Sequence, residues 1–511
     1  MHHMRKALLN FARKHQVKIH RKLLYQNIRC VSTVEMPPKE KPEPLGTIPK
    51  GILGQATCHT HPHLIPLDYL TCGITQSEYK ERRETLVSKL LNAVDNVHKT
   101  HIIVIPGASK QYMSDKIPYV FRQNSDFFYL TGCLEQSAIL VMVKPAQIDR
   151  IKTILFVHEK DAQAELWEGP RTGCTAAVSL FAVDEARPVE QFGTFLSRTV
   201  LDSKPSILWY HNETPANPDI HDTVRSVLLN DVMLRDPQRT LHLMRVIKSP
   251  AEIELMKETC YIGSQSVNMA MACTRPGVSE HMVNAVLEYS SKQGGAEHLA
   301  FPPVVAGGPR ATHIHYITNN QLLHEREMLL VDSGCQRWLY NSDISRTWPV
   351  SGKFNKYHKI LYELVLTVQK RLIELLDEHR PPLDQLFDNM CRLLGMHLQQ
   401  EGILPKSISG QALIANTFRL CPHHVSHYLG LDVHDSPLVQ RNGPVTSNMV
   451  VTVEPGIYIR PDDTSVRPEF RGVGIRIEDD VLLTDGGPAI LTSTCVKEVD
   501  DIEAIVGKHA I

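Results

Sequence analysis

The sequence predicts a two-domain α/β protein, and three observations support this prediction. With 511 residues, the chain exceeds the usual size of a single domain. Between about residues 67 and 229, short apolar runs alternate with amphipathic polar stretches, as in an α/β domain. Beyond a boundary near 235–248, acidic residues and histidines gather in or beside apolar runs, which indicates that the second domain carries the chemistry.

Charge and cysteine content exclude several functional classes. Fifty-five Lys and Arg residues nearly balance 56 Asp and Glu residues, so we expect neither a nucleic-acid partner nor a membrane-surface partner. No apolar run reaches about 18 residues, so no transmembrane span is predicted. The eleven cysteines contain no C-x-x-C pair, which indicates free thiols in a reducing compartment rather than a disulfide framework.

The first 34 residues are basic and contain no Asp or Glu. Eight Lys and Arg residues are interleaved with apolar ones, and this pattern predicts a mitochondrial presequence over 1–34 that is cleaved just beyond Arg29. A disordered basic tail is the alternative. Residues 35–65 are predicted to form a Pro-rich connector. We therefore expect the protein in the mitochondrial matrix, and a start at Met36 would give a cytoplasmic form.

Residues 66–240 are predicted to form the N-terminal domain. The runs HIIVIPG (101–107), AILVMVK (138–144) and TILFVHE (153–159) indicate buried strands. The stretch 76–97 has the spacing of an amphipathic helix. No catalytic cluster is evident in this domain.

A helix with a clear start signal opens the C-terminal domain, which is predicted for residues 245–508. Ser249 has the side chain of an N-cap, and Pro250 suits the first helical position. Glu252 completes the pattern of a capping box.

Two carboxylates of this domain are predicted to face each other in a β-hairpin. In EMLLVDSGCQRWLYNSDISRTWPV, one apolar run ends in Asp332 and a second extended run passes through Asp343. A loop of two or four residues centred between Arg337 and Trp338 would place them directly opposite, with Cβ atoms about 5 Å apart. Two like charges at that distance require a shared proton or cation. A slipped register with both side chains in solvent is the alternative.

Two further predicted strands contain acidic residues. NMVVTVEPGIYI holds Glu454 just before a Pro-Gly turn. GVGIRIEDDVLLT alternates with period two, so that Arg476, Glu478 and Asp480 share one face. A carboxylate in such an apolar strand is costly unless it is paired or coordinates a metal. A solvated strand edge is the alternative for each residue alone, but four such carboxylates together predict a metal site.

The stretch PHHVSHYLGLDVHD (422–435) supplies the imidazoles. Its histidines are His423, His424, His427 and His434. The zinc-peptidase motif H-E-x-x-H is excluded because position 424 is His instead of Glu. One imidazole from this stretch would complete a dinuclear site with the four carboxylates, and this mostly oxygen-based ligand set favours Mn(II) or Co(II). The other histidines remain available for substrate binding and proton transfer.

At these residues the sequence resembles the pita-bread metallopeptidases, and most closely aminopeptidase P. The resemblance covers about residues 66–508, and HYLGLDVHD, VEPGIYI and IRIEDD are its most specific motifs. It implies a creatinase-like α/β N-terminal domain, followed by a pita-bread α+β catalytic domain with a curved, mostly antiparallel sheet. The metal ligands that it implies are Asp332, Asp343, His427, Glu454 and Glu478.

The resemblance also implies a cofactor and a reaction. Two Mn(II) ions are expected, with Co(II) or Zn(II) as alternatives. Asp343 and Glu478 would bridge them, Asp332 would bind one ion, and His427 with Glu454 the other. The reaction would release the first residue of peptides with proline in the second position, by means of a hydroxide that bridges the two ions. A homodimer is the oligomeric state that the family implies.

Further site residues follow from the same resemblance. The catalytic set comprises His315, His423, His434, Glu454 and Arg476. The substrate-binding set comprises Phe301, His315, His427, His434 and Arg476. His434 would stabilise the oxyanion and Glu454 would take up a proton. Phe301 occupies a position where the family often has Tyr, so one polar contact with the substrate would be lost.

Three alternatives are open at this point. A prolidase with the same fold would hydrolyse only Xaa-Pro dipeptides. A pita-bread protein without metals would act as a non-catalytic interaction protein, although all five ligand positions are intact here. A structural mitochondrial protein with incidental histidines is the third.

Overall fold

The computed structural model describes residues 47–509, except for 95–98, 204, 214–216 and 229–231. The predicted presequence, its cleavage site and the start at Met36 lie outside the described residues, as does the first part of the connector. No helix in the part of the chain that the structure describes combines the length and the apolarity needed to cross a membrane.

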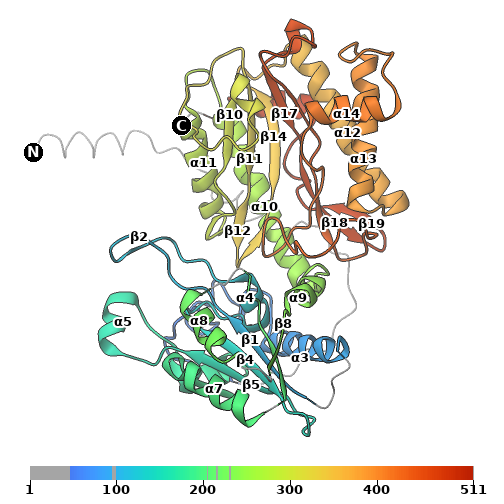
Figure 1. Ribbon diagram of the computed structural model, residues 1–511. Helices are drawn as coiled ribbons and strands as arrows, with labels where there is room; N and C mark the ends of the chain where they lie inside the picture. The colour runs from blue at the N-terminus through green and yellow to red at the C-terminus, as the bar shows by residue number, and fades with distance from the viewer. Residues whose placement is uncertain (1–46, 95–98, 204, 214–216, 229–231, 510–511) are drawn as a thin grey trace, which may run out of the picture. The chain divides into compact units, whose positions relative to one another are not determined.

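The N-terminal domain is built around a six-stranded sheet in the order β6-β5-β4-β1-β7-β8 (Figure 1). Its strands are β1 (Thr100–Pro106), β4 (Ile139–Lys144), β5 (Lys152–Val157), β6 (Glu185–Pro188), β7 (Ser206–Trp209) and β8 (Val232–Arg235). The pairs β1–β4 and β4–β5 are antiparallel, whereas β1–β7, β7–β8 and β5–β6 are parallel. The three strands expected from the apolar runs are therefore confirmed as β1, β4 and β5.

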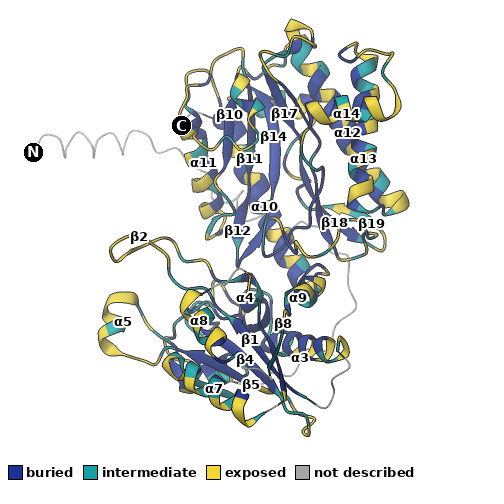
Figure 2. Ribbon diagram, viewed as in Figure 1, coloured by how far each residue is buried: buried dark blue, intermediate teal, exposed yellow. Residues whose placement is uncertain are grey.

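Helices cover both faces of this sheet because its central strands are apolar on both sides (Figure 2). Ile103 and Ile105 of β1 pack in one core cluster with residues of α3, α4 and α6, while Ile102 and Val104 pack with α7 and α8 in another. The helices are α3 (Gln76–Asn92), α4 (Ser125–Thr131), α5 (Ala162–Glu168), α6 (Gly173–Leu180), α7 (Phe192–Asp202) and α8 (Pro218–Ser226). The expected amphipathic helix is confirmed as α3.

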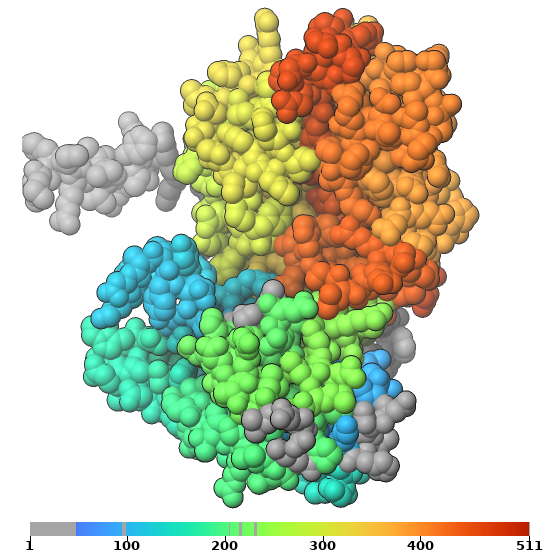
Figure 3. Space-filling model, viewed as in Figure 1, coloured from blue at the N-terminus to red at the C-terminus, as the bar shows by residue number. Residues whose placement is uncertain are grey.

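A small hairpin of β2 (Tyr112–Ser114) and β3 (Ile117–Pro118) lies beside α5. The hairpin and α5 are seen at the left side of the N-terminal domain in Figure 3. Lys110 Nζ lies 3.4 Å from Glu168 Oε2, which joins the hairpin to the helix end.

The predicted helix start of the C-terminal domain is confirmed. The Ser249 hydroxyl accepts a hydrogen bond from Glu252 N, and the Glu252 carboxylate accepts one from Ser249 N, which is a capping box at the start of α10 (Pro250–Cys273). The short helix α9 (Gln238–Arg245) leads into it from the N-terminal domain. The predicted limits of the two domains remain predictions.

The C-terminal domain contains four small antiparallel sheets between two groups of helices (Figure 1). The helices on one side are α10 and α11 (Glu280–Gln293), and on the other α12 (Lys356–His379), α13 (Leu383–Gln400) and α14 (Gly410–Leu420); α15 (Val499–Ile505) lies near the C-terminus and contacts α10. The sheets have the orders β10-β11-β14, β13-β12-β9, β15-β18-β19 and β16-β17. Three of the edge strands are β9 (His298–Leu299), β10 (Val304–Gly307) and β19 (Gly487–Ile490). The expected mixed architecture with mostly antiparallel strands is confirmed.

The predicted register of the carboxylate hairpin is wrong. Its strands are β11 (Met328–Ser333), β12 (Cys335–Arg337), β13 (Tyr340–Asn341) and β14 (Ile344–Pro349). Arg337 pairs with Tyr340, so the two-residue loop is Trp338–Leu339 and its centre lies one residue later than predicted. Asp332 consequently opposes Ser345 instead of Asp343. Trp338 and Leu339 have φ angles of 50° and 65°, as a type I′ turn requires, but neither residue type indicates such a turn.

The two long strands predicted for the other carboxylates are each broken in two. Residues 448–459 form β15 (Val450–Val453) and β16 (Gly456–Ile459), with Glu454 and Pro455 between them. Residues 472–484 form β17 (Val473–Arg476) and β18 (Asp479–Thr484), with Ile477 and Glu478 between them. At each break the chain passes from one sheet to another.

The carboxylate hairpin is interrupted in the same way, between β11 and β12 and between β13 and β14. Gly334 separates β11 from β12, and a Cβ atom on this glycine would lie 1.8 Å from the carbonyl oxygen of Ser342. Only glycine therefore allows the two strands to approach at this point. Asp343, Glu454 and Glu478 lie within strand breaks, and Asp332 lies one residue before the end of β11, so all four predicted carboxylate ligands are at or near a break.

Candidate metal centre

The structure brings the five predicted ligands to the region of the strand breaks. Asp332 is near the end of β11, and Asp343 immediately precedes β14. Glu454 follows β15, and Glu478 precedes β18. His427 lies beyond α14, where its neighbour Tyr428 forms a bridge to Val451 of β15.

Three of these side chains have the geometry of a metal site. Ligand atoms of Asp343, His427 and Glu478 all lie within 4.8 Å of one another, and all three residues are buried. His427 Nε2 is 3.4 Å from Asp343 Oδ2 and 3.6 Å from Glu454 Oε1. His427 Nδ1 donates a hydrogen bond of 3.1 Å to the Tyr428 carbonyl oxygen, so the lone pair of Nε2 is free to bind a metal.

The buried carboxylates of the cluster repel one another, so a positive charge between them would stabilise their ionised form. Burial, followed by the charges of the other carboxylates, raises the pKa of Asp343 and of Glu478 well above the ordinary range. Burial also raises the pKa of Glu454, although His427 and Arg476 oppose this shift. Among the described residues, Asp332 Oδ1 and Glu478 Oε1 are buried without a hydrogen-bond partner. Buried carboxylates with free oxygens fit divalent cations, so this chain's residues fit the metal centre.

Arg476 lies at the edge of the cluster and holds two of its members. Its Nη2 donates to Asp332 Oδ2 at 2.6 Å, and its Nε donates to Ser345 Oγ at 2.7 Å. Ser345 Oγ in turn donates to Glu478 Oε2 at 2.7 Å. The Arg476 pKa is raised well above the ordinary value because the surrounding Tyr458 and carboxylates outweigh the effect of burial. Arg476 therefore remains charged and orients both carboxylates.

His423 is connected to Arg476 through Tyr458. His423 Nδ1 donates to the His424 carbonyl oxygen at 2.8 Å, so its Nε2 accepts the phenolic hydrogen of Tyr458 at 2.9 Å. The same Tyr458 oxygen accepts a hydrogen bond from Arg476 Nη1 at 2.6 Å. His423 Nδ1 also lies 3.8 Å from Glu454 Oε2. His423 and Arg476 are thus brought together beside the predicted ligands.

His434 packs directly on a predicted ligand. Its ring centroid is 4.5 Å from that of His427, with an interplanar angle of 71°. Burial, followed by electrostatic interactions with His427, Arg441 and His315, lowers the pKa of His434 to about 4. The imidazole is consequently neutral at pH 7 and can donate a hydrogen bond.

The remaining predicted residues are placed less centrally. His315 is exposed and close enough to His434 to influence its pKa. Phe301 is half-buried and makes no ring contact with the cluster among the residues that the structure describes. His424 stacks on Phe387 with ring centroids 5.1 Å apart, outside the cluster.

Sequence reasoning missed several residues that support the site. Ser345 and Tyr458 follow Asp343 and Glu454 by even numbers of residues, so a period of two continued past each carboxylate would have indicated them. Asp480, which the period-two pattern already placed on the face of Glu478, accepts a hydrogen bond through Oδ2 from Asp343 N at 3.0 Å and one from Cys260 Sγ at 3.2 Å. Cys260 lies on α10, far from Asp480 in the sequence, so no local sequence pattern indicates that it supports the site.

Comparisons with known proteins agree with this site. Residues 254–485 match the metallopeptidase family M24, and residues 79–209 match the aminopeptidase P N-terminal domain. The chain is 39% identical to Xaa-Pro aminopeptidase 3 of Rattus norvegicus over 487 residues, which are 94% of this chain and 95% of the rat protein. It is 35% identical to the mitochondrial intermediate cleaving peptidase 55 of Arabidopsis thaliana, over 89% of this chain and 88% of that protein.

A solved structure shows the same fold. Zinc-substituted Escherichia coli aminopeptidase P in complex with product superimposes with a TM-score of 0.76 and 30% identity, over 84% of this chain and 98% of the bacterial one. The chain therefore belongs to the aminopeptidase P group of metallopeptidase family M24 and is a metal-dependent aminopeptidase.

Proposed function

We propose that this aminopeptidase releases the N-terminal residue from peptides that have proline in the second position. The observation that carries the proposal is the buried cluster in which His427 Nε2 faces Asp343 and Glu454, with the His434 ring packed edge-to-face against His427. The name of the rat relative supports the proline preference.

We propose two Mn(II) ions as the cofactor. Asp332, Asp343, Glu454 and Glu478 offer oxygen atoms and His427 offers one nitrogen, a donor set that suits Mn(II) better than a closed zinc site. When bound, the ions would supply a water molecule of lowered pKa and a Lewis acid for the peptide carbonyl. Metal analysis of protein purified without chelators tests both the identity and the number of the ions.

The chain's own side chains then have distinct tasks. Glu454 accepts the proton of the attacking water and passes it towards the proline nitrogen. Neutral His434 donates a hydrogen bond to the oxyanion, an effect worth about 3–4 kcal/mol for one well-placed donor. Arg476 holds Asp332 in place, and together with His315 and His423 it lines the proline side of the site.

The test is a set of three peptides that differ in one feature each. We expect release of the first residue from an Xaa-Pro-Xaa tripeptide, stimulated by Mn(II) after chelation. An Xaa-Ala-Xaa tripeptide should react at least about a hundredfold more slowly, because the proline contacts are lost. Faster cleavage of the Xaa-Pro dipeptide than of the tripeptide would establish the prolidase alternative instead.

We also propose a mitochondrial location and a homodimer. The basic segment 1–34 and the mitochondrial Arabidopsis relative support the location. Imaging of the full chain against a version without residues 1–34 tests it, and sedimentation of the purified protein tests the homodimer.

A further inference from the structure

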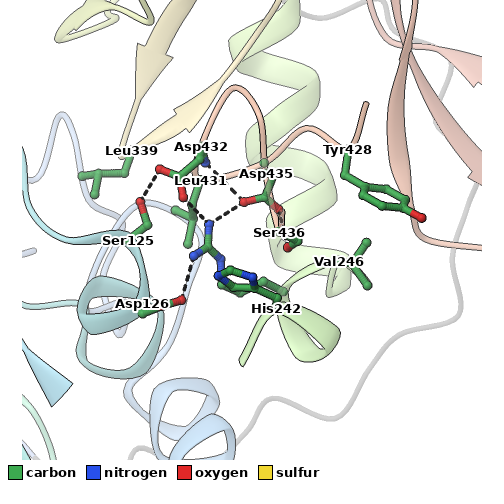
Figure 4. A network of polar contacts seen from close by, with 12 residues as sticks. Ser125, Asp126, His242, Val246, Leu339, Tyr428, Leu431, Asp432, Asp435 and Ser436 are labelled. Atoms are coloured by element: carbon green, nitrogen blue, oxygen red, sulfur yellow. Dashed lines mark hydrogen bonds and ion pairs between the residues drawn. The ribbon is translucent and has the colours of Figure 1, made fainter. Parts of the chain in front are cut away.

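A buried ionic cluster joins the N-terminal domain to the loop that carries His434 (Figure 4). The Arg245 cluster, as we call it, consists of Asp126, Arg245, Lys248, Asp432 and Asp435. Asp126 belongs to α4 of the N-terminal domain, and Arg245 is the last residue of α9. Figure 4 shows Asp126, Asp432 and Asp435 converging from two domains.

One guanidinium group makes the connection. Arg245 Nη1 donates to Asp126 Oδ1 at 2.7 Å, while its Nη2 donates to Asp432 Oδ2 at 2.6 Å and also to Asp435 Oδ1. Lys248 Nζ donates to the other oxygen of Asp435 at 3.1 Å. Arg245, Lys248 and Asp435 are each at most 3% exposed, so the contacts among these three residues are shielded from water. The Asp432 side chain is 36% exposed, so its contact with Arg245 is only partly shielded.

The contacts fall on both sides of His434. Asp432 and Asp435 flank it in the loop 429–436, and Asp435 N donates to the Tyr428 carbonyl oxygen at 2.9 Å. Because Tyr428 directly follows His427, this hydrogen bond holds the end of the loop next to His427, the residue against which the His434 ring packs. A fixed position of Asp432 and Asp435 therefore fixes the short backbone segment that carries the His434 imidazole.

The loop leaves little room for another arrangement. A Cβ atom on Gly430 would lie 2.7 Å from Asp435 Oδ2 and 3.0 Å from Lys248 Nζ, so the loop backbone packs directly on the cluster. Arg122 Nη2 donates to the Leu431 carbonyl oxygen at 2.5 Å, and Ser125 Oγ donates to Asp432 Oδ1 at 2.7 Å. The N-terminal domain thus contacts the loop at several points.

We infer that Arg245 is a positioning residue, which holds His434 over His427 and makes the N-terminal domain part of the catalytic geometry. The inference rests on the oxyanion role proposed above for His434. A planar guanidinium can bind carboxylates in three directions at fixed angles, and the ammonium of lysine cannot reproduce this geometry. A displacement of about 1 Å at a catalytic group can lower the rate about a hundredfold.

A purely structural role is the competing explanation, and Arg82 provides a matched control. Arg82, in α3 of the N-terminal domain, is also buried and also joins the two domains, with its Nη2 3.3 Å from Glu252 Oε2 of α10. It donates to the Tyr129 carbonyl oxygen at 3.1 Å, and among the described residues it makes no hydrogen bond or ion pair with the loop 429–436. Arg82→Lys should therefore disturb the domain contact without moving His434.

The experiment compares Arg245→Lys, Arg82→Lys, His434→Ala and the double variant Arg245→Lys/His434→Ala. All are assayed with the peptide that the wild type cleaves fastest, at matched metal content and below their melting temperatures. We expect Arg245→Lys to lower kcat about tenfold or more and Arg82→Lys to stay within about twofold of the wild type. In the His434→Ala background, Arg245→Lys should change kcat by less than about twofold, because its effect acts through His434.

A crystal structure of Arg245→Lys gives a readout that does not depend on turnover. We expect the His427–His434 centroid distance to exceed the wild-type 4.5 Å by about 1 Å, and to stay unchanged in Arg82→Lys. Additive losses in the double variant, or an unmoved His434, would overturn the inference even if the wild type cleaves Xaa-Pro peptides. Conversely, a displaced His434 in an enzyme without proline preference would retain the inference and refute only the proposed specificity.

Discussion

Glu478 and Asp479 are adjacent and both buried, yet their pKa values move in opposite directions. Burial and the nearby Asp343 raise the Glu478 pKa well above its ordinary range. The Asp479 carboxylate instead accepts hydrogen bonds from Arg346 Nη2 at 2.7 Å and from Lys497 Nζ at 2.5 Å. These two cations hold the pKa of Asp479 well below its usual value despite burial. One carboxylate thus requires a cation and the other already has two.

This contrast predicts opposite effects of two amide substitutions in the chelated protein. Glu478→Gln removes a repelled charge, so the free energy of unfolding should stay the same or rise. Asp479→Asn leaves the charge of Arg346 buried without its partner and should lower the free energy of unfolding by about 3–5 kcal/mol. Urea unfolding with excess chelator at pH 7 measures both. Equal destabilisation by the two variants would show that Glu478 is not repelled by its neighbours.

Tyr458→Phe should impair catalysis more than stability. The phenol both donates to His423 and accepts from Arg476, and its loss leaves these two groups without a common partner. We expect kcat to fall about tenfold at unchanged metal content, with a stability loss of about 1 kcal/mol. Tyr362→Phe is the control, because its buried phenol donates to the Lys497 carbonyl oxygen in the same domain. It should show the stability loss alone.

Gly334→Ala should disrupt the metal centre. The added methyl group would lie 1.8 Å from the Ser342 carbonyl oxygen, so the strands that carry Asp332 and Asp343 must separate. We expect a loss of at least about 3 kcal/mol in the free energy of unfolding together with weaker metal binding. Gly443→Ala, where nothing lies within 4 Å of the new methyl group, should remain within about 0.5 kcal/mol of the wild type. Calorimetric titration with Mn(II) and thermal unfolding test the pair.

The contribution of Asp435 to stability should depend on pH with a defined sign. Arg245 and Lys248 hold the pKa of Asp435 well below its usual value despite burial. A depressed folded-state pKa gives stability that is present above the unfolded-state pKa of about 3.9 and is lost as the pH falls. The difference in unfolding free energy between wild type and Asp435→Asn should therefore be largest at pH 6–7 and shrink as the pH is lowered below about 5. A difference that grows towards acid pH would contradict the assignment.

Much of the molecule could be predicted from local sequence because the signals are local. The capping box at Ser249 and Glu252 lies within one helical turn, and the apolar runs of β1, β4 and β5 each form a complete strand. Carboxylates in apolar strands are costly wherever the strands lie, so residue type alone made Asp332 and Asp343 candidate ligands.

The register and the breaks of the strands could not be predicted in the same way. Trp338 and Leu339 adopt left-handed backbone angles that cost about 1–3 kcal/mol each, and they do so because both side chains are buried in a core that includes residues of the N-terminal domain. The Arg245 cluster likewise joins residues far apart in the chain. The sequence by itself therefore determined which groups can bind metals, through the cost of burying them. Only tertiary packing decided which of them meet, because the energies that set a turn and align a loop come from contacts between distant segments.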